Sequence, residues 1–137
     1  MGFYTEVGES AIAVRAAIPA IKAKELCDDN FFSIRAVAGE VYCEIGPLYT
    51  GADTYPFASY REFSGGNDDL AAELATLIER IKTAFPEATF TGYAELESSE
   101  GWHSMIEVTP DGNVWLRDGG EITYTETRRH ISAGVKE

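Results

Sequence analysis

The segment from Glu95 to His103 contains side chains whose types could bind a metal ion. Glu95 and Glu97 alternate on a predicted strand and so share one face, and Glu100 and His103 follow across a predicted turn. No second histidine or cysteine joins them within reach in the sequence. Calcium sites space their oxygen ligands more densely along the chain than this segment does. The pattern favours a charged loop, and the sequence predicts no metal and no cofactor.

The two cysteines are candidates for nucleophilic chemistry. Cys27 or Cys43 would need His103 or His130 beside it as a base, and neither lies in an electropositive stretch of sequence. Cys43 falls on the apolar side of a strand pattern, which is typical of a small core residue. Since the chain opens without an export signal, we expect two reduced thiols in a cytoplasmic protein.

Two further features of the sequence could suggest catalysis. Gly65-Gly66-Asn67 precedes a predicted helix but lacks both the P-loop lysine and the glycine spacing of a dinucleotide site. A glycosidase needs two carboxylates that face each other across a cleft. A chain this acidic supplies candidate pairs through its composition alone, so their presence does not indicate a glycosidase. We therefore expect that the protein is not an enzyme.

Acidic side chains dominate the sequence. The 137 residues include 23 Asp and Glu against 11 Lys and Arg, for a net charge of −12. Thirteen acidic and three basic side chains lie between Asn67 and Glu126, where the secondary-structure signals are clearest. The acidity therefore belongs to a folded surface. Because nucleic acids and anionic membranes are bound by basic patches, we expect no direct binding to either.

The element that would organise this surface is a helix over residues 68–85. Asn67 is a suitable N-cap, and Asp68 and Asp69 occupy the first turn, where negative charge suits the helix dipole. Pro86 stops the helix. Apolar residues at helical spacing predict its buried face: Leu70, Leu74, Leu77, Ile78 and Ile81.

The first part of the chain predicts two strands and a short helix. Residues 3–7 alternate as a strand does, and Gly8 permits a turn. Residues 11–17 predict a second strand, although the alanines there also suit a helix. Pro19 fits the first turn of a short helix that ends near Cys27.

A strand pair and a long connection follow. Phe32, Ile34 and Ala36 predict one face of a strand, and Val41, Cys43 and Ile45 predict the inward face of its partner. Residues 46–66 indicate an irregular connection, of which residues 55–63 could form another strand.

An antiparallel meander follows the long helix. Hairpin turns at residues 109–113 and 118–120 separate its last strands, which end with Ile122 and Tyr124. Its predicted core residues are Phe90, Leu96, Ile106, Val108, Val114 and Leu116. The whole chain, residues 1–137, is thus predicted as one α+β domain. We expect an antiparallel sheet of six or seven strands with one long and one short helix on one face.

The sheet face opposite the helices collects acidic and aromatic residues if the meander is in register. The residues are Tyr93, Glu95, Glu97, Glu107, Trp115 and Arg117. We expect this face to bind a basic surface of a partner protein, because opposite charges steer the two proteins together and aromatic side chains anchor the complex. The glutamates could also mimic DNA phosphates and occupy the basic cleft of a nucleic-acid-binding protein.

Other uses of the same face remain open. The face could be a solvated surface, or it could form a homo-oligomer, since an exposed strand invites pairing. The alternative is a small-molecule enzyme or ligand-binding domain that works through Tyr93, Glu95, Glu107 and Trp115.

Two stretches resemble a family of small proteins of actinobacteria and their phages. The first is the opening Met-Gly-Phe-Tyr-Thr-x-Val-Gly-Glu, where that family begins Met-Gly-Tyr-Tyr-Thr. The second is Phe-Thr-Gly-Tyr-Ala-Glu at residues 90–95, followed by Gly-Trp, a valine strand and Asp111-Gly112. The resemblance covers about half of the chain, and the middle and the last strand depart from it. It implies a phage or mobile-element origin, and it transfers no catalytic residue because the family has no assigned activity.

Overall fold

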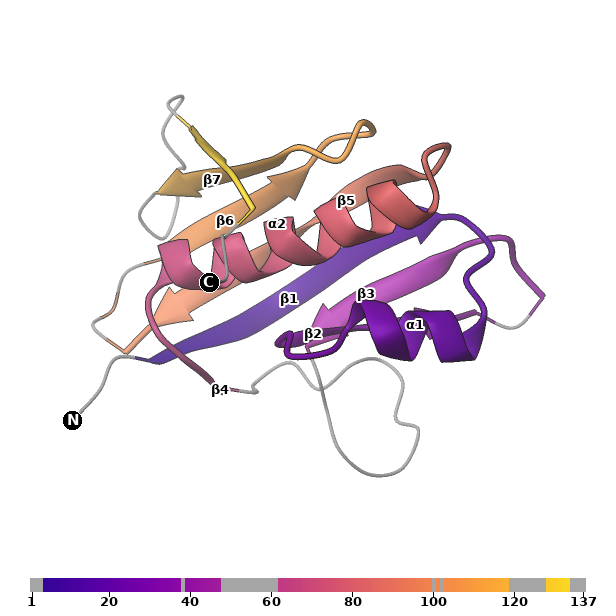
Figure 1. The fold of residues 1–137 in the computed structure, drawn as a ribbon. Coiled ribbons are helices and arrows are strands. Elements are labelled where there is room, and N and C mark those ends of the chain that lie inside the picture. The colour runs from indigo at the N-terminus through magenta and orange to yellow at the C-terminus, as the bar shows by residue number, and fades with distance from the viewer. Residues whose placement is uncertain are drawn as a thin grey trace.

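The computed structural model describes residues 4–37, 39–47, 62–99, 101, 103–118 and 128–133. Two helices, α1 (Ala20–Leu26) and α2 (Asn67–Ala84), interrupt the series of strands (Figure 1). The strands are β1 (Tyr4–Arg15), β2 (Phe32–Ala36), β3 (Cys43–Pro47), β4 (Glu62–Ser64), β5 (Thr89–Ser98), β6 (His103–Val108), β7 (Val114–Asp118) and β8 (Arg129–Ile131).

All eight of these strands belong to one antiparallel sheet. The order is β2-β3-β1-β5-β6-β7-β8, and β4 pairs with the end of β1 that β3 leaves free. Both helices lie on the same side of this sheet (Figure 1). The predicted α+β class is confirmed, with one strand more than the six or seven expected. We call the side that carries no helix the outer face.

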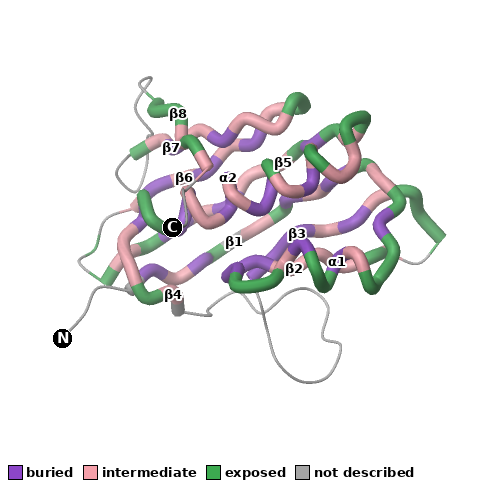
Figure 2. The backbone as a smooth tube through the Cα atoms, viewed as in Figure 1, coloured by how far each residue is buried: buried purple, intermediate pink, exposed green. Residues whose placement is uncertain are grey.

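The predicted apolar face of α2 forms the centre of the core. Leu70, Leu74, Leu77, Ile78 and Ile81 are each at most 1% exposed. The strands contribute the facing side chains, and every core residue predicted in the meander is buried: Phe90, Leu96, Ile106, Val108, Val114 and Leu116. In Figure 2 the buried positions, in purple, recur along α2 and along the strands behind it. No helix among the described residues is long and apolar enough to cross a membrane.

The helix ends differ little from the predictions. Pro19 precedes α1 and Cys27 follows it, as expected. The N-cap of α2 is Gly66, one residue before the predicted Asn67. Asp69 Oδ2 accepts a hydrogen bond from the Gly66 backbone N–H at 3.2 Å, so a first-turn carboxylate satisfies the helix end.

The prediction of a turn at Gly8 was wrong. β1 runs through this glycine as one strand of 12 residues. Its register against β5 shifts between Val7 and Ser10, so that two residues oppose Glu95 alone, which is a β-bulge. The irregularity that the glycine marks is therefore absorbed within the strand.

The strand pair β2–β3 is partly as predicted. Cys43 and Ile45 are buried, but Val41 is 63% exposed because β3 begins only at Cys43. Ile34 packs against the core but is only half-buried. Of the predicted strand 55–63, only its last two residues are described, in β4. The strand predicted at Ile122 and Tyr124 lies outside the described residues.

The free edge of β2 is closed by side chains from the segment just before it. Asn30 Oδ1 accepts a hydrogen bond from the Phe32 N–H at 2.9 Å. The Cys27 sulfur accepts one from the Ile34 N–H. The Asn30 side chain also donates a hydrogen bond from Nδ2 to the backbone carbonyl oxygen of Glu73 in α2, at 2.8 Å. Two backbone donors on the free edge of β2, those of Phe32 and Ile34, are thus satisfied within the chain.

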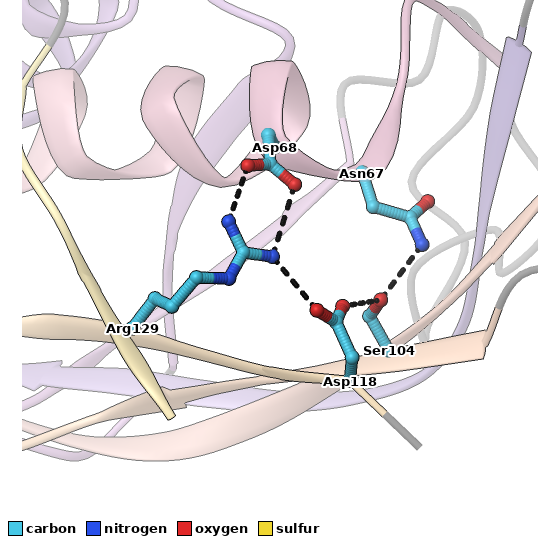
Figure 3. A network of polar contacts seen from close by, with 5 residues as sticks. All are labelled: Asn67, Asp68, Ser104, Asp118 and Arg129. Atoms are coloured by element: carbon cyan, nitrogen blue, oxygen red, sulfur yellow. Dashed lines mark hydrogen bonds and ion pairs between the residues drawn. The ribbon is translucent and has the colours of Figure 1, made fainter. Parts of the chain in front are cut away.

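A polar network joins the first turn of α2 to the strands (Figure 3). Asn67 Nδ2 donates to Ser104 Oγ, which donates to Asp118 Oδ1, each at 2.8 Å. Arg129 of β8 donates to Asp118 Oδ2 at 2.9 Å and to both carboxylate oxygens of Asp68. Arg129 thereby holds β8 against α2 and β7.

Candidate protein-binding face

The six residues predicted to share the outer face do so. The pairing of β5, β6 and β7 alternates buried side chains on the helix side with side chains on the outer face. One register row runs Tyr93–Glu107–Trp115 and continues to His130 on β8. The next row runs Glu95–Met105–Arg117. The predicted surface is therefore continuous across at least three strands.

The carboxylate of Glu107 is not free on this face. Arg117 Nη2 lies 2.6 Å from Glu107 Oε1, and Arg128 Nη1 lies 3.5 Å from Oε2. Both side chains of the closer pair are less than 30% exposed, so solvent screens this ion pair less than a surface pair. Glu107 therefore adds no net negative charge, and one of the three carboxylates expected to be available to a partner is already neutralised.

Trp115 is enclosed by cationic and aromatic neighbours. The Arg128 guanidinium lies over its ring, with the central carbon 4.5 Å from the ring centroid. The His130 ring meets it edge-on, with centroids 5.1 Å apart. Nε2 of His130 lies 2.9 Å from Asn113 Oδ1, which fixes the imidazole ring. These contacts hold the tryptophan as a half-buried, ordered part of the face.

Free negative charge gathers at one end of the outer face. Glu6 of β1 pairs in register with Glu97 of β5, which pairs in turn with His103 of β6. Glu95 lies two residues along β5 on the same face. Glu6, Glu95 and Glu97, which we call the acidic end, make no ion pair with the described part of the chain. Carboxylates directly opposite one another repel, so this end is poised to gain from a cation.

The metal hypothesis finds no support in this geometry. His103 and Glu97 are cross-strand neighbours, but no group of three or more His, Cys, Asp or Glu in the described residues could hold a metal ion. Glu100 lies outside the described residues.

The cysteines lie where they suit structure better than nucleophilic chemistry. Burial raises the pKa of the Cys27 thiol above its usual value, and this outweighs the opposite effects of the Ile34 N–H and the Arg80 charge. Cys43 is buried, and its Sγ lies 3.5 Å from the Ala16 carbonyl oxygen. A raised pKa disfavours the thiolate that would react.

Three hollows in the described part lie away from the predicted residues. The largest, about 720 Å³, lies between α1 and β2 and reaches Cys27. Another of about 450 Å³ lies beside α2. A third, about 520 Å³, lies on the outer face near Arg15, Tyr42 and Thr91. None of these three hollows is lined by Tyr93, Glu95, Glu107 or Trp115, so none of the three supports a ligand site at those residues.

Sequence reasoning missed three contributors to the outer face. Arg128 and His130 follow β7 by more than nine residues, and only the β7–β8 pairing brings them beside Trp115. Glu6 joins Glu97 through the β1–β5 pairing. The adjacent arginines at 128 and 129 were a visible signal, but the partners of each lie far away in the sequence.

Comparison of the chain with known protein families, with curated proteins and with solved structures finds no match in any of the three.

Proposed function

We propose that this chain is a non-catalytic protein-interaction domain whose outer sheet face docks on a basic surface of a partner protein. One observation carries the proposal. The acidic end, Glu6, Glu95 and Glu97, presents carboxylates that no cation of the described chain neutralises. A basic partner would relieve their mutual repulsion and would be steered towards them.

Aromatic side chains beside the acidic end provide what charge alone does not. Tyr93 and Trp115 flank Glu107 in one register row, and both are half-buried. Aromatic side chains held in place by neighbours contribute contact area at little cost in conformational entropy, and they dominate the energetics of many interfaces. The docking surface would therefore combine a charged end with an aromatic centre.

Ordinary protein binding accounts for this face better than phosphate mimicry. An imitation of DNA needs regularly spaced, unpaired negative charges. Glu107, the expected member on β6, is bound by Arg117 and Arg128. The remaining carboxylates form a cluster at one end and leave the middle of the face neutral.

Affinity capture from a host lysate tests the proposal. The chain is compared with the double variant Glu95→Lys/Glu97→Lys at ~0.05 M and ~0.5 M salt, across which the Debye length falls severalfold. The matched control, Glu79→Lys/Glu87→Lys, makes the same charge change at exposed positions away from the outer face.

We expect the unmodified chain and the control variant to retain a partner protein at low salt. High salt should release this partner, and so should the charge reversal at Glu95 and Glu97. Retention of that partner by the reversed variant at both salt concentrations would rule out the electrostatic docking surface. Equal loss in the control would show that total charge, and not this face, governs binding.

A further inference from the structure

The outer face differs from the rest of this acidic molecule in its charge. Among the described side chains on this face, the acidic residues are Glu6, Glu44, Glu95, Glu97 and Glu107, and the basic ones are Arg15, Arg35, Arg117 and Arg128. Five negative and four positive charges nearly cancel, in a chain of net charge −12. A second copy would therefore meet little net repulsion at this face, unlike elsewhere on the surface.

The charges are also separated in a way that allows two copies to match. Glu95 on β5 and Arg117 on β7 lie in the same register row, one strand to either side of Met105 on β6. Adjacent strands are ~4.8 Å apart, so the two charges sit at equal distances from β6. A two-fold axis along β6 would exchange these positions between two facing copies. Each Glu95 would then face the Arg117 of the other copy.

The neighbouring row matches under the same operation. Tyr93 and Trp115 flank Glu107 on β6 at equal distances. The two-fold axis places each Tyr93 against the Trp115 of the other copy, which is a favourable aromatic pairing. The two Glu107 carboxylates meet near the axis, but each is already neutralised by Arg117 and Arg128. Two sheets with aligned strands pack face to face in this way at ~10 Å.

We infer that two copies of this chain associate through their outer faces about a two-fold axis that runs along β6, past Met105 and Glu107, with Glu95 of each copy paired to Arg117 of the other. Arg117 has the capacity for this second contact. Its guanidinium carries five N–H donors, and Nη2 makes its ion pair with Glu107. This inference rests on the proposed function and names Arg117 of a second copy as the basic partner of Glu95.

Salt separates this association from binding to a basic partner. Two copies of charge −12 repel at long range, and this repulsion weakens as the Debye length falls from ~30 Å at ~0.01 M to ~8 Å at ~0.15 M salt. Self-association should therefore strengthen over this range. Binding to a basic protein should weaken over the same range, because there the long-range force is attractive.

Complementary single variants test the pairing. In a dimer of the Glu95→Arg variant, two positive charges meet at each of the two contacts between positions 95 and 117. In a dimer of the Arg117→Glu variant, two negative charges meet at each of these contacts. We expect each alone to lose self-association by ~10-fold or more in sedimentation experiments. Mixed in equal amounts, the two variants face opposite charge at both contacts, and we expect them to form a heterodimer. This recovery also shows that both variants are folded.

A variant on the axis gives an independent test. Met105→Glu places two equal charges face to face and should give monomers. Thr89→Glu, which adds the same charge at an exposed outer-face position away from the axis, should leave the dimer intact.

A wild-type chain that stays monomeric at ~0.15 M salt and high concentration would overturn the inference, as would a dimer that survives both single charge reversals or a mixture that stays monomeric. The proposed function would outlive that result if lysate capture still yielded a partner sensitive to the reversal of Glu95 and Glu97.

Discussion

Gly92 and the Ala11 carbonyl oxygen approach so closely that a Cβ atom on Gly92 would lie 1.9 Å from that oxygen. The glycine also has φ of +122°, a conformation that L side chains rarely adopt. It lies in the middle of β5 where β1 pairs with it. The two longest strands of the sheet therefore depend on the absence of one side chain.

Substitution of Gly92 by alanine should prevent folding or lower the free energy of unfolding by more than ~3 kcal/mol, because the obstacle is backbone and cannot rotate away. Chemical denaturation measures the loss. Gly39→Ala is the control: its φ is +79° but nothing lies within 4 Å of the added atom, so it should cost only ~1 kcal/mol. Equal losses in the two variants would contradict the steric argument.

Leu77→Ala should lower the free energy of unfolding by ~2–5 kcal/mol, the usual cost of removing a buried leucine side chain. Leu77 has no exposed surface and lies on the face of α2 that packs against the sheet. Urea denaturation measures the loss. Glu79→Ala on the exposed side of the same helix should change stability by less than ~0.5 kcal/mol. A Leu77 variant as stable as the Glu79 variant would mean that α2 does not form the core.

Arg129→Ala should loosen the attachment of β8 and the first turn of α2. The guanidinium donates hydrogen bonds to the carboxylates of Asp68 and Asp118, and these bonds raise its pKa. Because the group is partly solvated, the global cost should be only ~1 kcal/mol. Amide hydrogen exchange should accelerate locally, in β8 and residues 67–70. Lys24→Ala, on exposed α1, should leave these amides unchanged, and a uniform acceleration across the sheet would contradict a local role for Arg129.

Cys27 should react slowly with an alkylating reagent in the folded protein. Its folded-state pKa lies above the usual value, so at pH ~8 the folded chain holds less thiolate than the unfolded chain does. In the Cys43→Ala variant, the alkylation rate of Cys27 should rise with pH as the thiolate forms. The pH at the midpoint of this rise should be higher for the folded protein than for the protein unfolded in urea. An equal or lower midpoint in the folded protein would show that burial does not control this thiol.

The spacing of apolar residues along the chain predicted which faces of α2 and of the strands are buried. The spacing of Leu70, Leu74 and Leu77 on α2 reports burial directly, because one helix face must pack against the core. The alternation in β5, β6 and β7 placed the six outer-face residues correctly for the same reason. Hairpin connections fix register between neighbouring strands, so this much follows from sequence.

Pairings between distant segments could not be predicted. Gly8 has the conformational freedom of a turn residue, and only the partner strand β5 decides that the chain continues through a bulge. Arg128, which forms an ion pair with Glu107 and helps to neutralise its charge, lies 21 positions away in the sequence. Arg129 is 61 positions from Asp68. Contacts of this kind decide how much of the acidity remains available, and no local spacing reports them.

The closed edge of β2 bears on how large an assembly of this chain can grow. An open strand edge can pair with further strands side by side and so permits filaments of unlimited length. The Phe32 and Ile34 N–H groups on this edge are already bound to Asn30 and Cys27, so an incoming strand cannot pair with them. Growth in the plane of the sheet is therefore disfavoured at this edge. Contact through the outer face about a two-fold axis is used up once two copies meet, so this contact by itself gives a dimer.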